Sequence, residues 1–170
     1  MLNRRTSSET SAPAVAAWPC LPNPSVTFSD VWLWVVDSEP CIGEAVQVLA
    51  KTFFGSERVE VFPDKSAALE KLSQLDHAPP LIITDFRNSA DGMNGAQFIR
   101  RARQCATLTP RFILFSALIH DSDQFVRAGG DPHGLPDAIV PKPDIIELAQ
   151  AIAGILAANR ETESCNQSAG

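Results

Sequence analysis

The stretch LIITDFRNSADGMNGAQFIRRAR, residues 81–103, decides the fold of this chain. It begins with the apolar residues 81–84, and Asp85 follows them directly. A polar loop with two glycines then leads into a segment whose apolar residues recur at helical spacing. A short strand that is apolar on both faces is typical of a parallel sheet covered by helices. The stretch therefore predicts a buried strand, a loop and a helix, with Asp85 at the carboxyl end of the strand.

The same alternation continues on both sides of this stretch. Further apolar segments that predict strands lie at residues 31–36, 59–62, 112–115 and 138–140. Patterns that predict helices lie at residues 40–53, 67–75, 98–102, 121–127 and 145–156. Strands that alternate with helices form parallel sheets with right-handed crossovers. We therefore predict an α/β fold, a doubly wound five-stranded parallel sheet with helices on both faces.

The two ends of the chain differ in composition from this central part. Residues 1–28 are rich in Ser, Pro and Ala and show no sustained period, which predicts a flexible extension. Residues 159–170 are small and polar, which predicts a fraying tail. The folded domain is expected over residues 29–158. Neither end has room for a DNA-binding or enzymatic output domain, so we expect a single-domain protein.

Composition excludes several classes of protein. The chain has 170 residues and a net charge of -6, so the basic footprint of a general nucleic-acid binder is missing. Its four cysteines are far apart and lack zinc-ligand spacing, which argues against a disulfide framework or structural zinc and favours the reducing cytoplasm. No apolar run approaches the ~18 residues of a membrane-spanning helix. We expect neither nucleic acid nor membrane as a partner.

Polar residues gather where the predicted strands end. They are Asp37, Ser38 and Glu39 after the first strand, Asp85 after the third, Ser116 after the fourth and Lys142 after the fifth. Ligands of such sheets bind at the carboxyl ends of the strands. Carboxylates suit Mg²⁺, whereas a lysine and a hydroxyl suit the oxygens of a transferring phosphoryl group. Since a carboxylate can form an acyl phosphate, these residue types favour phosphoryl transfer onto Asp85.

Four segments at these strand ends resemble the receiver domains of two-component response regulators. They are VVDSEP, the stretch 81–103 quoted above, FILFSA and IVPKPDIIELAQAI, and they occur in the order of that family. The resemblance covers residues 31–158 and implies the flavodoxin-like, receiver type of fold. It also implies a phosphoprotein of phosphorelay signalling rather than an enzyme. Its partners would be a histidine kinase or phosphotransfer protein and a downstream protein target.

The resemblance also implies a role for each strand-end residue. Asp85 would be the phosphoacceptor, Ser116 would contact the phosphoryl group, and Lys142 would pair with it. Mg²⁺ would be held by Asp37, Asp85 and the backbone carbonyl of Arg87, with Glu39 as a further candidate ligand.

The chain departs from the family pattern at several places. Ser38 stands where the family usually has a second aspartate, so we expect weaker Mg²⁺ binding. The loop after Asp85 is longer than usual, and Ile139 occupies the position of an aromatic switch residue. Arg87 places a guanidinium close to the acceptor. We hypothesise that Arg87 partly replaces Mg²⁺ by pairing with Asp85 or with its phosphoryl group.

Two other functions remain open at this point. The first is a pseudo-receiver, an interaction module that keeps the fold with weak or no phosphorylation. The second is a haloacid-dehalogenase-like phosphatase, which also uses an aspartate, a Ser or Thr and a lysine. That family needs a second aspartate two residues after the nucleophile, where this chain has Arg87.

Overall fold

A computed structural model describes residues 32–90, 92–105 and 110–167 of the chain. Its strands are β1 (Leu33–Val36), β2 (Val59–Phe62), β3 (Leu81–Thr84), β4 (Arg111–Ser116) and β5 (Ala138–Pro141). Its helices are α1 (Pro40–Phe54), α2 (Lys65–Ser73), α3 (Gly95–Cys105), α4 (Ser122–Arg127) and α5 (Ile145–Gln167). Strands and helices alternate throughout, which confirms the predicted α/β architecture.

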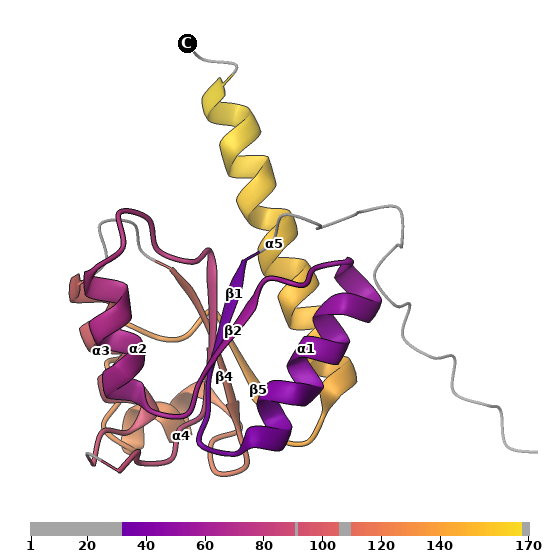
Figure 1. The fold of residues 1–170 in the computed structure, drawn as a ribbon. Helices are drawn as coiled ribbons and strands as arrows, with labels where there is room; N and C mark the ends of the chain where they lie inside the picture. The colour runs from indigo at the N-terminus through magenta and orange to yellow at the C-terminus, as the bar shows by residue number, and fades with distance from the viewer. Residues whose placement is uncertain (1–31, 91, 106–109, 168–170) are drawn as a thin grey trace, which may run out of the picture.

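The five strands form one parallel sheet in the order β2-β1-β3-β4-β5. Helices α1 and α5 cover one face of the sheet, and α2, α3 and α4 cover the other (Figure 1). Neighbouring residues of a strand point to opposite faces, so Leu33 and Val35 pack beneath α1 and α5 while Trp34 and Val36 pack on the opposite side. Both faces are therefore buried, and this explains why the strands are apolar without alternation.

Both ends of α1 are explained by local residues. Pro40 is the first residue of α1, where its missing N–H would have had no helical partner. Gly55 ends the helix with a φ of 66°, and its N–H donates to the carbonyl of Lys51. Helix α1 consequently begins immediately after Glu39, which keeps the β1–α1 loop short.

Several boundaries differ from the prediction, and two of them lie at the start and the end of the domain. Strand β1 begins at Leu33; of the two residues predicted before it, position 31 lies outside the described residues, and Trp32 precedes the strand and donates its Nε1–H to Glu60 Oε1 at 3.1 Å. Helix α5 extends to Gln167, so the polar residues after 158 continue the helix instead of fraying (Figure 1). This segment contains Arg, Glu and Gln, whose high helix propensity a search for apolar periodicity does not register.

Some predictions concern residues outside the described part of the chain. The flexible extension at residues 1–28 lies wholly outside it. In the described residues, no helix is both long enough and apolar enough to span a membrane.

Candidate functional site

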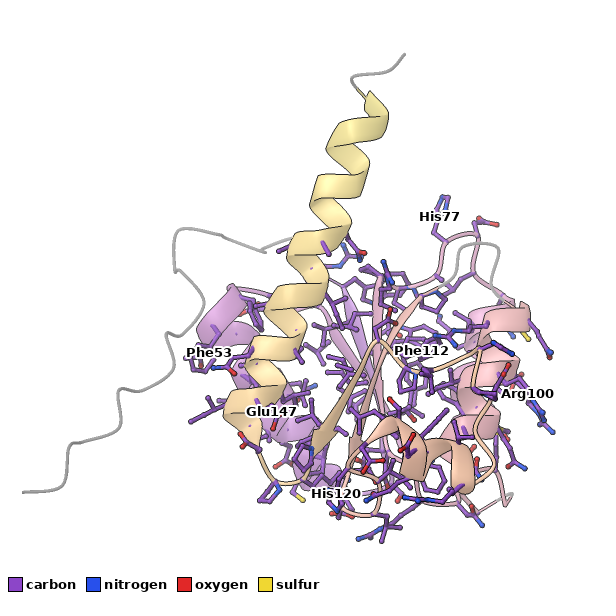
Figure 2. All side chains as sticks on the ribbon, turned by 180° about the vertical axis from the view of Figure 1, so that it is seen from behind. Phe53, His77, Arg100, Phe112, His120 and Glu147 are labelled. Atoms are coloured by element: carbon purple, nitrogen blue, oxygen red, sulfur yellow. The ribbon has the colours of Figure 1, made fainter. Side chains whose placement is uncertain are left out.

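The winding of the chain reverses between β1 and β3, and such a reversal opens a crevice at the carboxyl ends of the two strands. Val36 pairs with Thr84 in the register, and the Asp85 N–H donates to the Val36 carbonyl at 3.2 Å. Asp37 and Asp85 thus leave adjacent strands at the same level. Figure 2 labels His120, which follows β4 at this end of the sheet, and His77 at the opposite end.

Asp37 is buried at the base of this crevice. Its Oδ1 accepts the N–H of Glu39 at 2.9 Å, and its Oδ2 accepts a hydrogen bond from Lys142 Nζ at 2.7 Å. Burial raises the pKa of the Asp37 carboxyl above its usual value, and the hydrogen bond from Lys142 acts in the opposite direction. Asp37 is therefore a carboxylate whose charge depends on Lys142.

Asp85 is buried beside Asp37, with 3% of its side chain exposed. Its Oδ1 accepts the N–H of Phe86 at 2.7 Å and lies 3.8 Å from Lys142 Nζ. Among the described residues, none donates a hydrogen bond to Asp85 Oδ2. One oxygen is thus fixed by the protein, while the other keeps its lone pairs.

Ser116 and Lys142 come from the ends of β4 and β5. The N–H of Lys142 donates to the Ser116 carbonyl at 3.0 Å, which links the two strand ends. The Ser116 hydroxyl oxygen accepts the N–H of Leu118 at 3.1 Å, so its hydrogen points elsewhere. Lys142, with 8% of its side chain exposed, contacts both Asp37 and Asp85. The structure therefore brings Asp37, Asp85 and Lys142 together.

Arg87 does not pair with Asp85 in this structure, so that part of the hypothesis is wrong, whereas pairing with a phosphoryl group stays a prediction. Arg87 Nη1 instead lies 2.9 Å from Glu39 Oε1, at the more exposed mouth of the site. Glu39 reaches this position because it directly precedes α1, and its Oε1 is also 3.9 Å from Lys142 Nζ. The carboxylate of Glu39 is therefore the one within reach of the Arg87 guanidinium, whereas Asp85 lies deeper and faces Lys142. Ser38 is exposed.

Sequence reasoning missed one residue of the site, Lys65. It is the first residue of α2, it is only 4% exposed, and its Nζ donates to the backbone carbonyl of Arg87 at 2.8 Å. A signal existed in the sequence. A lysine in the first turn of a helix, directly after the capping residue Asp64, opposes the helix dipole. A lysine in this position therefore indicates that its ammonium is stabilised by a contact with another part of the chain.

The expected Mg²⁺ ligands are engaged by cations of the protein itself. Lys142 binds Asp37, Arg87 binds Glu39, and Lys65 binds the Arg87 carbonyl. In the described residues, no three His, Cys, Asp or Glu side chains converge as a metal site. Mg²⁺ is usually held by one or two carboxylates together with waters, so the oxygens of Asp37, Asp85 and the Arg87 carbonyl suit the ion, and its binding stays a prediction.

Helix α3 closely approaches Asp85. Gly95 begins the helix, and its N–H donates to the Phe86 carbonyl at 3.0 Å. A Cβ at this position would lie 2.5 Å from the Asp85 carbonyl oxygen and 2.9 Å from the Phe86 Cα. Because both atoms belong to the backbone, neither can rotate away. Gly95 is thus required for the loop after Asp85 to lie where it does.

Gly95→Ala is expected to lower the free energy of unfolding by about 1–3 kcal/mol through this overlap. Gly154→Ala is the matched control, because a Cβ there on α5 meets nothing within 4 Å. The control should raise stability by about 0.5–1 kcal/mol, as expected for alanine in a helix. Urea denaturation of both variants measures the difference. Equal effects of the two substitutions would contradict the close approach.

A scan against protein-family models and a comparison with curated protein sequences find no match. Solved structures do match. A response regulator receiver domain protein from Clostridium thermocellum has a TM-score of 0.62 and 19% identity over 78% of this chain and 98% of its own. The HemR receiver domain from Leptospira biflexa has a TM-score of 0.57 and 20% identity, covering 72% of this chain and 91% of its own.

A third structure, the signal receiver domain of an HD domain-containing protein from Pseudomonas fluorescens Pf-5, has a TM-score of 0.60 and 21% identity. The match covers 76% of this chain and 96% of that domain. All three are similar to this chain over nearly their whole length, so its fold is the flavodoxin-like fold of receiver domains. At these identities the likeness concerns the fold, and the chemistry of the site has to be argued from its own residues.

Proposed function

We propose that this protein is a phosphoacceptor receiver of two-component phosphorelay signalling, with Asp85 as the acceptor. The observation that carries the proposal is the geometry of Asp85. Its Oδ1 accepts the Phe86 N–H and lies 3.8 Å from Lys142 Nζ, and its Oδ2 has no donor among the described residues. A buried carboxylate held in this way is a preorganised nucleophile.

The proposed step is an in-line displacement at phosphorus. Asp85 Oδ2 forms a P–O bond while the P–N bond of a phosphohistidine, or the P–O bond of an acyl phosphate, breaks. The electron pair leaves with the donor's nitrogen or oxygen, and a departing imidazole nitrogen takes up a proton. The three peripheral phosphoryl oxygens carry the developing charge, and Lys142 and the Ser116 hydroxyl would bind them.

The partners follow from this chemistry. The phosphoryl donor would be a histidine kinase or a phosphotransfer protein, and the signal would pass through contacts with a downstream protein. The net charge of -6 supports protein rather than nucleic-acid contacts. We place this activity in the cytoplasm, in keeping with the separated cysteines.

Incubation of the full chain with a small acyl phosphate tests the proposal. We expect a mass increase of one phosphoryl group, located on Asp85 by peptide mapping, and its complete loss in Asp85→Asn. Asp64→Asn is the control, because this half-buried carboxylate caps α2. The control should retain the adduct.

One observation favours the pseudo-receiver as the alternative. Lys142 Nζ is hydrogen-bonded to Asp37 at 2.7 Å and is 3.8 Å from Asp85. If that pair never opens, the lysine cannot serve a phosphoryl group. No adduct on wild-type protein, with or without Mg²⁺, would therefore favour an interaction module that signals through its surface alone.

A further inference from the structure

A cavity of about 340 Å³ lies between helix α3 and the loop from α4 to β5, residues 128–137. Its polar lining comes from three residues of α3 and three of the loop, namely Arg100, Arg103, Gln104, Asp131, His133 and Gly134. The proposed phosphoryl transfer uses none of them. Small molecules bind in cavities of about 300–1,000 Å³, so the size of this cavity suits a ligand at the small end of that range.

Two guanidinium groups of α3 line this cavity. Arg103 is half-buried and held in place, because its Nη2 donates to the Leu135 carbonyl at 2.8 Å and its Cζ lies 5.3 Å from the centre of the Phe112 ring. Arg100, three residues earlier on the same side of the helix, is exposed and forms no hydrogen bond or ion pair with the described residues (Figure 2). No carboxylate of the described residues pairs with Arg103 either. Two unpaired guanidinium groups in one cavity favour an anion, and phosphate matches their hydrogen-bonding geometry.

The loop supplies an acceptor and open space. Asp131 Oδ1 accepts the His133 N–H at 2.9 Å, whereas its Oδ2 accepts no hydrogen bond from the described part of the chain. A Cβ at Gly134 would lie 3.1 Å from that Oδ2 and 3.2 Å from Arg103 Nη1. Gly134 does not have a positive φ, so its backbone conformation does not require glycine. A donor of Arg103 and an acceptor of Asp131 therefore border the same space, which the missing side chain leaves open.

We propose that this cavity binds a small phosphate monoester that also carries hydroxyl groups, such as a sugar phosphate. The phosphoryl oxygens accept hydrogen bonds from Arg100 and Arg103, and a hydroxyl of the ligand donates to Asp131 Oδ2. A phosphate monoester without hydroxyls leaves Asp131 unpaired, and an uncharged sugar leaves the two arginines unpaired. Asp37, Asp85 and Lys142 do not line the cavity, so the inference goes beyond the proposed function and does not rest on it.

An NMR titration of the isotope-labelled full chain tests the inference, with ribose 5-phosphate and glucose 6-phosphate as probes. Ribose and phenyl phosphate are the comparison ligands, because the first has hydroxyls without a phosphate and the second has a phosphate without hydroxyls. We expect saturable shifts of the Arg103 and Gly134 backbone amides with at least one sugar phosphate. The dissociation constants of both comparison ligands should be higher by about 10-fold or more, since each lacks a hydrogen bond to a charged group.

Arg100→Met removes one of the two guanidinium groups from an exposed position that has no contact to lose. It should raise the dissociation constant of the sugar phosphate by about 10-fold or more. Arg101→Met is the matched control, since it makes the same change of charge on the same helix at an exposed residue that does not line this cavity. Its dissociation constant should stay within about 2-fold of the wild type, because charges outside the cavity are screened.

Several results would overturn the inference. One is the absence of saturable binding of either sugar phosphate at millimolar concentrations. Another is an equal loss of affinity in Arg100→Met and Arg101→Met, which would indicate a general response to charge. Shifts confined to Asp37, Asp85 and Lys142 would place the phosphate at the strand ends instead. Phenyl phosphate that binds as tightly as the sugar phosphates would exclude a ligand recognised through its hydroxyls. None of these outcomes depends on phosphorylation of Asp85.

Discussion

Lys142→Met is expected to lower the free energy of unfolding by about 3–5 kcal/mol at neutral pH. The substitution leaves Asp37 as a buried carboxylate without its partner, the Nζ that now lies 2.7 Å from Asp37 Oδ2. The side chains of both residues are at least nine-tenths buried, so water cannot replace the lost contact. Urea denaturation followed by circular dichroism measures the loss.

The loss of unfolding free energy in Lys142→Met should become smaller as the pH is lowered. Burial already raises the pKa of Asp37 above its unfolded value, and removal of the Lys142 hydrogen bond would raise it further. A group of this kind favours folding most below its unfolded pKa, and that contribution is lost as the pH rises through its folded pKa. The variant should therefore approach the wild type on acidification, once Asp37 is protonated in its folded state.

Lys51→Met is the control for this prediction. Lys51 Nζ is also 2.7 Å from a carboxylate, Glu57 Oε1, but the two side chains are 70% and 73% exposed. Loss of the Lys51–Glu57 pair should lower the free energy of unfolding by only about 0–1 kcal/mol, because exposed pairs are screened and solvated. Similar losses for the two variants would contradict the burial of the Asp37 pair.

The second large effect is expected at Trp34, on the opposite face of the sheet from α1 and α5. Trp34 is fully buried, and its ring centroid lies 4.5 Å from that of Phe62. Trp34→Ala should cost about 3–5 kcal/mol through the cavity it leaves. Among the described residues, Trp34 Nε1 finds no hydrogen-bond acceptor. An unpaired buried donor itself costs about 1–3 kcal/mol.

Trp34→Phe should therefore cost less than half as much as Trp34→Ala, because it keeps an aromatic ring and removes the unpaired N–H. Trp32→Phe is the comparison, since Trp32 Nε1 donates to Glu60 Oε1 at 3.1 Å and that bond is lost. Chemical denaturation of the three variants checks the order. Equal losses of unfolding free energy for Trp34→Phe and Trp34→Ala would contradict an unpaired indole N–H at Trp34.

The sequence was sufficient for the architecture and for four residues of the site. Short strands that are apolar on both faces, alternating with helical segments of period 3.6, predict a doubly wound sheet. Once that sheet is given, the residues that follow each strand must meet at one edge. Asp37, Asp85, Ser116 and Lys142 could therefore be placed together without knowledge of any contact.

Sequence patterns did not predict how the charges pair. Arg87 is two residues from Asp85 in sequence, yet it pairs with Glu39, because depth and side-chain direction decide the partner. Lys65 is buried only because α2 packs against α3 and β2, which brings its Nζ to a carbonyl 22 residues away. The sequence by itself determined which residues stand at the edge of the sheet, since strand ends are set by local pattern. Only the tertiary structure decided which cation faces which carboxylate or carbonyl, because that depends on the packing of elements distant in sequence.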